Sequence, residues 1–220
     1  MFCRNCNAEI ENTFIDLGHS PPSNAYLTTQ DLQKKELYFP LKIGVCKNCW
    51  LVQTKDFIKA DELFTKDYAY LSSASKSWLE HCKKFVNYSI KEFNLEPSSF
   101  VIEVAANDGY LLQYYKSNNI KCLGIEPTQY AAELARNKGI EIISEFCTLE
   151  TAKRISNKKG KADLVIGNNV YAHVPDIKDF TLSLKELIKE NGIISLEFPH
   201  LMRLIQKIQF DTIYHEHFSY

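Results

Sequence analysis

The feature that most constrains the fold is an alternation of strand-like and helix-like segments that begins at Phe100. Short apolar runs such as 100–104 suit strands buried on both faces of a parallel sheet, and the segments between them repeat apolar residues at helical spacing. Strands are predicted at 100–104, 122–126, 140–143, 164–166 and 193–198, and helices at 110–116, 128–139, 149–155, 177–188 and 201–208. This order favours an α/β, doubly wound sheet with right-handed crossovers.

The first hundred residues follow a different pattern. Residues 1–55 are polar and rich in turns, with one strand-like piece at 38–43. A region this small buries little apolar surface and usually needs an additional cross-link. Residues 78–93 repeat apolar side chains every three or four positions, as an amphipathic helix does. We therefore predict a small domain at 1–55, a helical connector at 56–97 and the α/β domain at 98–220.

Four of the seven cysteines form two Cys-x-x-Cys pairs, Cys3 with Cys6 and Cys46 with Cys49. Two such pairs can direct four thiolates at one point and close a tetrahedral zinc site that has no open position for water. Metal binding would also stabilise a region too small to fold on its apolar core alone. His19 lies between the pairs and could compete as a ligand, but with four thiolates available it is expected to be a surface residue.

Composition narrows the possible partners. A net charge of −1 gives no electrostatic footprint for nucleic acid or for an anionic membrane surface, which disfavours a zinc-ribbon protein that binds nucleic acid. No apolar run approaches the ~20 residues that span a bilayer, and the N-terminus lacks the pattern of a signal peptide. Cysteines paired for a metal fit a reducing compartment. We therefore expect a cytoplasmic protein, and the oligomeric state stays open.

The turn at 103–109 follows the first strand of the predicted sheet. Backbone N–H groups and a helix N-terminus meet there, at the edge where such sheets bind ligands. Glu126 ends the next strand, where a carboxylate can accept hydrogen bonds from both ribose hydroxyls of an adenosine. A dinucleotide needs several glycines around its pyrophosphate, but this turn has only Gly109, and Asp108 would repel phosphate. S-adenosylmethionine (SAM) carries a positive sulfonium and no phosphate, so the turn favours SAM over NAD, with a plain strand-to-helix turn as the alternative.

Two further segments, added to the cysteine pairs and the Asn-Asp-Gly turn, carry a family resemblance. One is NNVYAHVPD at 168–176, after the fourth predicted strand, and the other is DTIYHEHFSY at 211–220. Over nearly its whole length the chain resembles the sugar C-methyltransferases, which modify nucleotide-linked 4-keto deoxysugars in antibiotic and surface-polysaccharide pathways. The tyrosine-histidine-glutamate-histidine sequence within 211–220 is the most specific part of the resemblance.

The resemblance implies a class I, Rossmann-like methyltransferase domain that binds SAM behind a zinc-ribbon-like domain. It also implies two more strands and a C-terminal domain that helps to hold the sugar nucleotide, and the chain ends before them. A sheet that stops at its fifth strand would expose an apolar edge, so self-association or poor solubility is expected. Ala105 stands where the family usually has glycine, and its methyl group could crowd the methionine part of SAM. The residues expected to bind the cofactor are Ala105, Asn107, Asp108, Gly109, Glu126, Asn168 and Asn169.

Methylating a carbon next to a ketone requires a base that removes the adjacent proton and a donor that stabilises the enolate oxygen. Imidazole titrates near neutrality, and the resemblance makes His217 the base, with Glu216 orienting it or replacing it. Tyr214 and His173 are expected to hydrogen-bond the ketone and stabilise the enolate. By resemblance, Tyr68 reaches the sugar from the N-terminal region.

Three alternatives stay open at this point. On an extended segment His215 and His217 share a face and Glu216 points the other way, so geometry does not separate the two histidines and His215 is the alternative base. Tyr70 is the alternative to Tyr68. The function itself has two alternatives: a non-catalytic fragment that retains zinc and SAM binding, or an O- or N-methyltransferase of the same fold.

Overall fold

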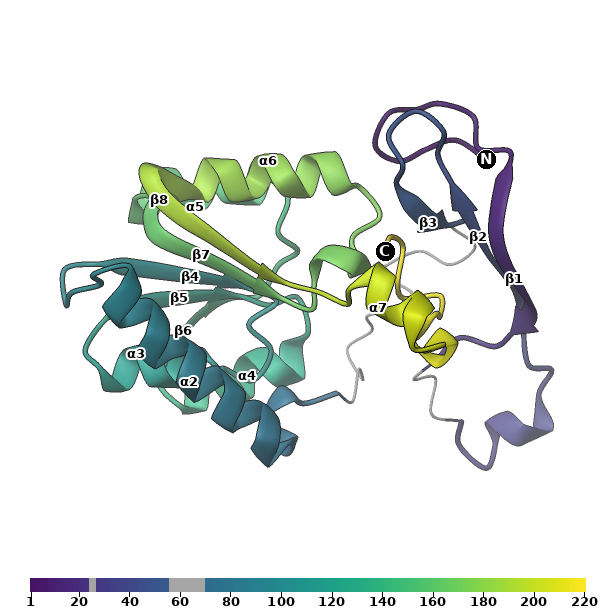
Figure 1. Ribbon diagram of the computed structural model, residues 1–220. Helices are drawn as coiled ribbons and strands as arrows, with labels where there is room; N and C mark the ends of the chain where they lie inside the picture. Colours follow the sequence, from purple (N-terminus) through teal and green to yellow (C-terminus); the bar gives the residue numbers. More distant parts are fainter. Residues whose placement is uncertain (24–26, 56–69) are drawn as a thin grey trace. The chain divides into compact units, whose positions relative to one another are not determined.

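The computed structural model describes residues 1–23, 27–55 and 70–220, which form two compact units. The cysteine unit holds the described residues up to 55, together with Tyr171–Lys178 and Phe198–Tyr220. The α/β unit holds residues 70–170 and Asp179–Glu197. Each unit is described by itself below, with the elements labelled in Figure 1.

The α/β unit contains a five-stranded parallel sheet of order β6-β5-β4-β7-β8. Its strands are β4 (Phe100–Val104), β5 (Lys121–Ile125), β6 (Glu141–Ile143), β7 (Ala162–Asn168) and β8 (Ile188–Glu197). β4, the first strand of the run, lies in the middle of the sheet. The chain adds β5 and β6 on one side of it and then β7 and β8 on the other, which is the doubly wound arrangement predicted from the sequence. All five residues of β4 are buried, as expected of a central strand covered on both faces.

Helices cover both faces of this sheet (Figure 1). They are α2 (Lys76–Glu92), α3 (Leu112–Ser117), α4 (Gln129–Asn137), α5 (Leu149–Lys159) and α6 (Ile177–Leu187), and a short 3-10 helix, η2 (Ser72–Ala74), precedes α2. In the figure α2, α3 and α4 lie against one face and α5 and α6 against the other. The main core joins α2, through buried Cys82 and Val86, to buried residues of α3, α4 and the central strands. The amphipathic pattern at 78–93 therefore packs against the sheet, as its spacing predicts.

Two local predictions differ from the structure. The last strand was predicted at 193–198, but β8 begins at Ile188 and runs through Asn191 and Gly192, with an irregular register against β7. A bulge absorbs the extra residues within a longer strand. The helix predicted at 128–139 is α4, which runs from Gln129 to Asn137, and the Thr128 hydroxyl donates to the Glu126 carboxylate and does not cap the helix.

The cysteine unit contains an antiparallel sheet of order β1-β2-β3. Its elements are β1 (Asn12–Ser20), η1 (Asp31–Gln33), β2 (Phe39–Val45), β3 (Val52–Thr54), η3 (Tyr171–His173), α7 (Leu201–Gln206) and η4 (Phe210–Thr212). A small core joins Leu41, Ile43 and Val52 of the sheet to Leu204 of α7 and to Ile213. The segments at 171–178 and 198–220, which the sequence led us to place in the α/β domain, thus pack and pair within this unit.

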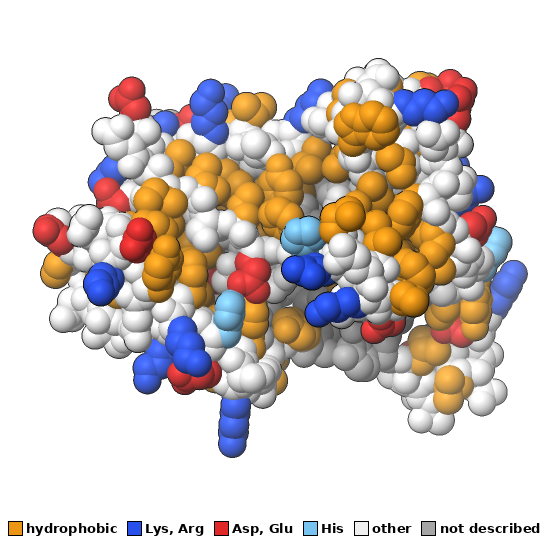
Figure 2. All heavy atoms as spheres, viewed as in Figure 1, with side chains coloured by type: hydrophobic (Ala, Val, Ile, Leu, Met, Phe, Trp, Pro, Cys, Tyr) orange, Lys and Arg blue, Asp and Glu red, His pale blue; other side chains and the backbone are white. Residues whose placement is uncertain are grey.

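The surface agrees with the charge balance of the sequence. Figure 2 shows Lys and Arg side chains interspersed with Asp and Glu on the visible face, rather than gathered by sign. Within the described ranges, no helix is long and apolar enough to cross a membrane.

Candidate functional site

The four predicted zinc ligands converge in the cysteine unit. The sulfur atoms of Cys3, Cys6, Cys46 and Cys49 all lie within 4.8 Å of one another, and the closest pairs are 3.4 and 3.5 Å apart. Four thiolates at about 2.3 Å from a tetrahedral zinc would be roughly 3.8 Å apart, so the donor set fits zinc. His19 lies on exposed β1 and is not part of this cluster.

Hydrogen bonds to two of the four sulfurs, those of Cys3 and Cys46, lower the pKa of their thiols, whereas contacts with neighbouring cysteines raise the pKa of Cys6. Burial opposes ionisation of Cys3, but backbone hydrogen bonds from Cys6 and Asn5 and a side-chain bond from Gln53 lower the pKa of its thiol to about 6. The Gln53 amide nitrogen lies 3.3 Å from the Cys3 sulfur. Zinc binds thiolates rather than thiols, so these donors prepare the site for the metal.

In the turn after β4, every second residue has a positive backbone φ angle. Ala105, Asn107 and Gly109 have φ angles of 56, 46 and 74 degrees, all in the left-handed region. Glycine and asparagine enter this region readily, whereas alanine pays a steric penalty. Gly109 is also tightly packed, because a Cβ there would lie 2.5 Å from the Ile140 side chain. Ala105, which stands where the resembling family usually has glycine, therefore adopts a backbone conformation that favours glycine.

The segment before α2 is hydrogen-bonded to this turn. The Asn107 side chain accepts from the backbone N–H of Ser72 (2.9 Å) and donates to the Tyr70 carbonyl (3.1 Å). Asp108 accepts from the Ser73 hydroxyl and from the Lys138 ammonium group at 3.1 Å. These contacts order the predicted cofactor turn, and they place Tyr70 beside it through the main chain rather than the phenol ring. Tyr68 lies outside the described residues.

Two buried carboxylates stand at the ends of neighbouring strands. Glu126, after β5, accepts hydrogen bonds from the backbone N–H groups of Asn107 (2.9 Å) and Thr128 (2.8 Å), although burial still raises its pKa. Glu103 of β4 is fully buried, and neither of its oxygens accepts a hydrogen bond of normal length among the described residues. Burial raises the pKa of Glu103 far above its usual range, opposed by the nearby Tyr110 hydroxyl.

These acceptors fit a cationic ligand. Glu103 was not among the predicted site residues, because an acid within an apolar strand gives no pattern of its own. The Oδ1 atom of Asp108 is buried without a hydrogen-bond partner in the described structure, so the turn keeps a carboxylate oxygen that a sulfonium or ammonium group could neutralise, whereas burial favours the protonated, neutral form of Glu103. A phosphate would be repelled, so this edge of the sheet suits SAM better than a dinucleotide.

Asn168 and Asn169 complete the carboxyl edge of the sheet. Asn168 ends β7 and is buried. Its side chain hydrogen-bonds to the Tyr110 hydroxyl, which also lies next to Glu103. Asn169 adopts a left-handed φ of 51 degrees, and its N–H donates to the Glu197 carbonyl at 2.6 Å. The α/β unit thus brings all seven predicted cofactor residues to the ends of β4, β5 and β7.

A cluster of aromatic side chains lies in the cysteine unit. The His217 ring is 4.6 Å from the His173 ring and 4.2 Å from the Tyr214 ring, measured between centroids. Tyr220, which was not singled out from the sequence, contacts His217 edge-on at 5.8 Å. The predicted base and its two predicted partners are therefore neighbours, although His173 and His217 are far apart in the sequence.

Hydrogen bonding fixes the tautomer of His217. Its Nδ1 atom lies 3.0 Å from the Thr212 carbonyl, and a carbonyl oxygen only accepts, so Nδ1 carries the proton and Nε2 carries the lone pair. Burial lowers the pKa of His217 to about 4. Burial and the neighbouring His217 lower the pKa of His173 to about 3. Both imidazoles are therefore uncharged at neutral pH, and His217 is ready to accept a proton at Nε2.

The structure separates the two candidate histidines, contrary to the expectation from an extended segment. His215 and Glu216 form a turn that is closed by a bond from the His217 N–H to the Tyr214 carbonyl. His215 instead packs against Phe39, and its Nε2 lies 3.2 Å from the Pro40 carbonyl.

The Glu216 carboxylate accepts from the Ser23 hydroxyl at 3.1 Å, while its backbone supports His173. This geometry favours His217 over His215 as the base, and the Thr212 carbonyl holds the His217 ring at Nδ1.

A parallel sheet of this order, with an acidic turn after its first strand and a carboxylate after its second, defines a class I SAM-dependent methyltransferase fold. The comparisons agree: residues 102–194 match the family described as a methyltransferase domain, and residues 3–64 match a putative zinc binding domain. The chain therefore combines a zinc-binding domain with a SAM-dependent methyltransferase domain, and the predicted fold class and cofactors are confirmed.

Among characterised proteins, the chain is similar to C-methyltransferase NovU of Streptomyces niveus, with 32% identity over 99% of this chain and 52% of that protein. The chain thus spans about half the length of this curated relative. A solved SAM-dependent methyltransferase from Anabaena variabilis aligns with a TM-score of 0.52 and 18% identity over 66% of this chain and 63% of its own. The Pyrococcus horikoshii protein PH0226 aligns with a TM-score of 0.50 and 15% identity, over 63% and 62% of the two chains. These likenesses between structures concern the fold.

Proposed function

We propose that the chain takes part in SAM-dependent methylation of a carbon next to the ketone of a nucleotide-linked deoxysugar, through an enolate. The observation that carries this proposal is the neutral His217, with its lone pair on Nε2, beside Tyr214 and His173. The likeness to a C-methyltransferase supports carbon as the acceptor atom.

The histidine cluster has the properties that enolate formation needs. His217 would remove the proton next to the ketone at Nε2, and the developing enolate charge would favour the resulting imidazolium despite its burial. His173 stays neutral when His217 is charged, because the two rings are in contact. The Tyr214 hydroxyl would donate to the enolate oxygen, where its effect is largest as charge develops.

The α/β unit would hold the cofactor. Glu126 would accept from the ribose hydroxyls, and the turn from Ala105 to Gly109 would hold the methionine part. Asn168 and Asn169 would line the same edge of the sheet. When bound, SAM supplies the electrophilic methyl group. We place the reaction in the cytoplasm, in the biosynthesis of deoxysugars or polysaccharides, because thiolates kept for zinc suit a reducing compartment.

The same fold could serve an O- or N-methyltransferase. Alcohols and amines need no base for a carbon acid with an enolate donor near it, so the pairing of His217 with Tyr214 favours carbon. An oxygen- or nitrogen-linked methyl group in the product would reverse this preference.

The test measures proton removal by the base separately from methyl transfer. A nucleotide-linked 4-keto deoxysugar is incubated with the chain in D₂O without SAM, and NMR follows deuterium entry next to the ketone. We expect exchange that His217→Gln reduces by at least the 10²-fold typical of a lost general base, while His200→Gln, an exposed histidine at the start of α7, leaves it unchanged.

Cofactor binding is measured on the same samples. Titration with S-adenosylhomocysteine (SAH) by calorimetry should give one saturable site in the wild type and in both histidine variants. SAH binding without proton exchange would refute the enolate mechanism and leave a cofactor-binding protein. Exchange that survives in His217→Gln would move the base to another residue, with His215 tested next.

A further inference from the structure

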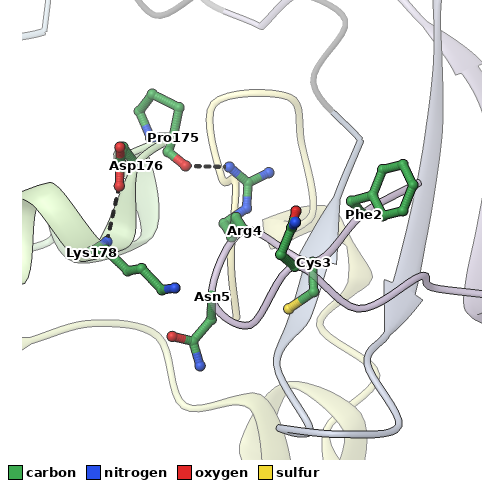
Figure 3. Close-up of a pocket in the computed structure, with 8 residues that line it drawn as sticks. Phe2, Cys3, Arg4, Asn5, Pro175, Asp176 and Lys178 are labelled. Atoms are coloured by element: carbon green, nitrogen blue, oxygen red, sulfur yellow. Dashed lines mark hydrogen bonds between the residues drawn. The ribbon is translucent and has the colours of Figure 1, made fainter.

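The zinc site and the histidine cluster share the cysteine unit, and one side chain joins them. Arg4 lies inside the first Cys-x-x-Cys pair, directly after Cys3. Its guanidinium group donates to the Pro175 carbonyl (2.7 Å) and to the Thr54 carbonyl (3.0 Å). Figure 3 shows the first of these bonds, which reaches from the cysteine pair to the loop after His173.

The Thr54 end of this link leads to His217. The Thr54 hydroxyl donates to the His217 carbonyl at 3.1 Å, and its N–H donates to the Phe218 carbonyl at 3.2 Å. The Arg4 guanidinium also lies over the Phe218 ring, 5.3 Å from its centroid. β3 and the last residues of the chain are therefore held side by side, with Arg4 hydrogen-bonded to Thr54 on one side and stacked over Phe218 on the other.

The Pro175 end leads to His173. Pro175 lies two residues after His173, just beyond η3. The two histidine segments also meet directly, because the Phe218 N–H donates to the Ala172 carbonyl at 2.7 Å. A guanidinium with a planar fork of donors suits two carbonyls at once, whereas an ammonium offers one nitrogen.

A second contact runs from the metal ligands to β3. The Gln53 side chain donates to the Cys3 sulfur at 3.3 Å and accepts from the Arg4 N–H at 3.0 Å. Gln53 is almost fully buried and forms an isolated antiparallel β-bridge with Ser219 near the last residue. Gln53 of β3 is therefore hydrogen-bonded both to the Cys3 sulfur and to the backbone of Arg4.

We propose that Arg4 is a positioning residue that couples the four-cysteine zinc site to His173 and His217. The zinc fixes the conformation of the first cysteine pair, and Arg4 and Gln53 carry that fixed geometry to the two histidine segments. The proposal rests on the proposed function only in naming the histidines as the reacting pair. It assigns to the zinc domain a role in the alignment of the catalytic groups.

The first experiment does not depend on activity. The 220-residue chain is labelled at histidine with ¹³C, and the imidazole signals are assigned by the His173→Gln and His217→Gln spectra. Arg4→Met removes both donors but keeps the apolar stem, and Arg4→Lys keeps the charge. Arg136→Met is the matched control, because Arg136 also donates to a backbone carbonyl, that of Ile142, but lies in the α/β unit.

We expect Arg4→Met to retain zinc and a cooperative melt, and to move the signals of His173 and His217 away from their wild-type positions. Arg4→Lys should move them less, and Arg136→Met not at all. Unmoved histidine signals in Arg4→Met, or equal movement in the control, would overturn the coupling. Loss of zinc from Arg4→Met would also overturn it, since Arg4 would then belong to the metal site alone.

The second experiment uses the deuterium exchange described above. Arg4→Met should slow exchange by on the order of 10- to 100-fold, the effect of misplacing a reacting group by about 1 Å, and leave SAH binding unchanged. Absence of exchange in the wild type would refute the proposed function, while the NMR measurement would still decide the coupling. Wild-type exchange rates in Arg4→Met, in spite of moved signals, would refute the positioning role.

Discussion

Ala105 should be a strained residue that glycine relieves. Its φ of 56 degrees lies in the left-handed region, where a residue with a Cβ pays roughly 1–2 kcal/mol. Glycine at this position would give the unfolded chain more conformational entropy, which lowers the free energy of unfolding by about 0.5–1 kcal/mol. The difference predicts that Ala105→Gly raises the free energy of unfolding by about 0.5–1 kcal/mol, or the melting temperature by roughly 1–4 °C for a chain of this size.

The neighbouring alanine provides a control with the opposite sign. Ala106 has no positive φ, is fully buried, and packs its methyl group close to Gly124. Ala106→Gly loses that methyl contact, worth about 0.8 kcal/mol, and adds the same cost of glycine, so it should destabilise the protein by about 1.3–1.8 kcal/mol. Urea melts measure both variants, and SAH titration should show tighter binding to Ala105→Gly. The reasoning fails if Ala105→Gly destabilises the protein as Ala106→Gly does.

Three further predictions follow from the same structure. As pH falls from 6.5 to about 4, stability should fall by on the order of 1–3 kcal/mol, because His217 is protonated in the unfolded chain before it is in the folded one, and His217→Gln should flatten this part of a urea-melt series. Cys46→Ser should lose zinc and the melt of the cysteine unit, whereas Cys147→Ser, outside the cluster, keeps both by metal analysis and calorimetry. Glu126→Gln should weaken SAH binding about tenfold or more without unfolding, and unchanged affinity would remove Glu126 from the cofactor site.

Most of the α/β fold was predictable because its signals are local. Each buried strand is an apolar run, and each helix shows its covered face in the spacing of apolar residues, as at 78–93. The ends were harder to place. α5 extends to Lys159 and β8 begins at Ile188, beyond the apolar residues that revealed them, because the exposed ends of an element carry little hydrophobic pattern.

The assignment of 171–178 and 198–220 to the cysteine unit was not readable from local pattern. It depends on long-range pairing, such as that of Tyr220 with Val52 and of Phe218 with Ala172. The turn at 215–216 was missed for a related reason. A run of polar and aromatic residues has no period of its own, so the extended conformation was only the simplest assumption. The bonds that His217 donates to the Tyr214 carbonyl, from its N–H, and to the Thr212 carbonyl, from Nδ1, decide the geometry.

The buried polar residues of the cysteine unit indicate why its four cysteines would need to bind a metal. His215, Glu216 and His217 are almost fully buried, in a unit whose apolar clusters are small. The Nδ1 atom of His215 has no hydrogen bond among the described residues, and such an acceptor costs about 1–3 kcal/mol. A structural zinc contributes about 10–16 kcal/mol in small peptides, which exceeds these costs. A bound zinc would thus allow a small unit to hold His173 and His217 uncharged in one fixed arrangement, which a marginal apolar core would not do alone.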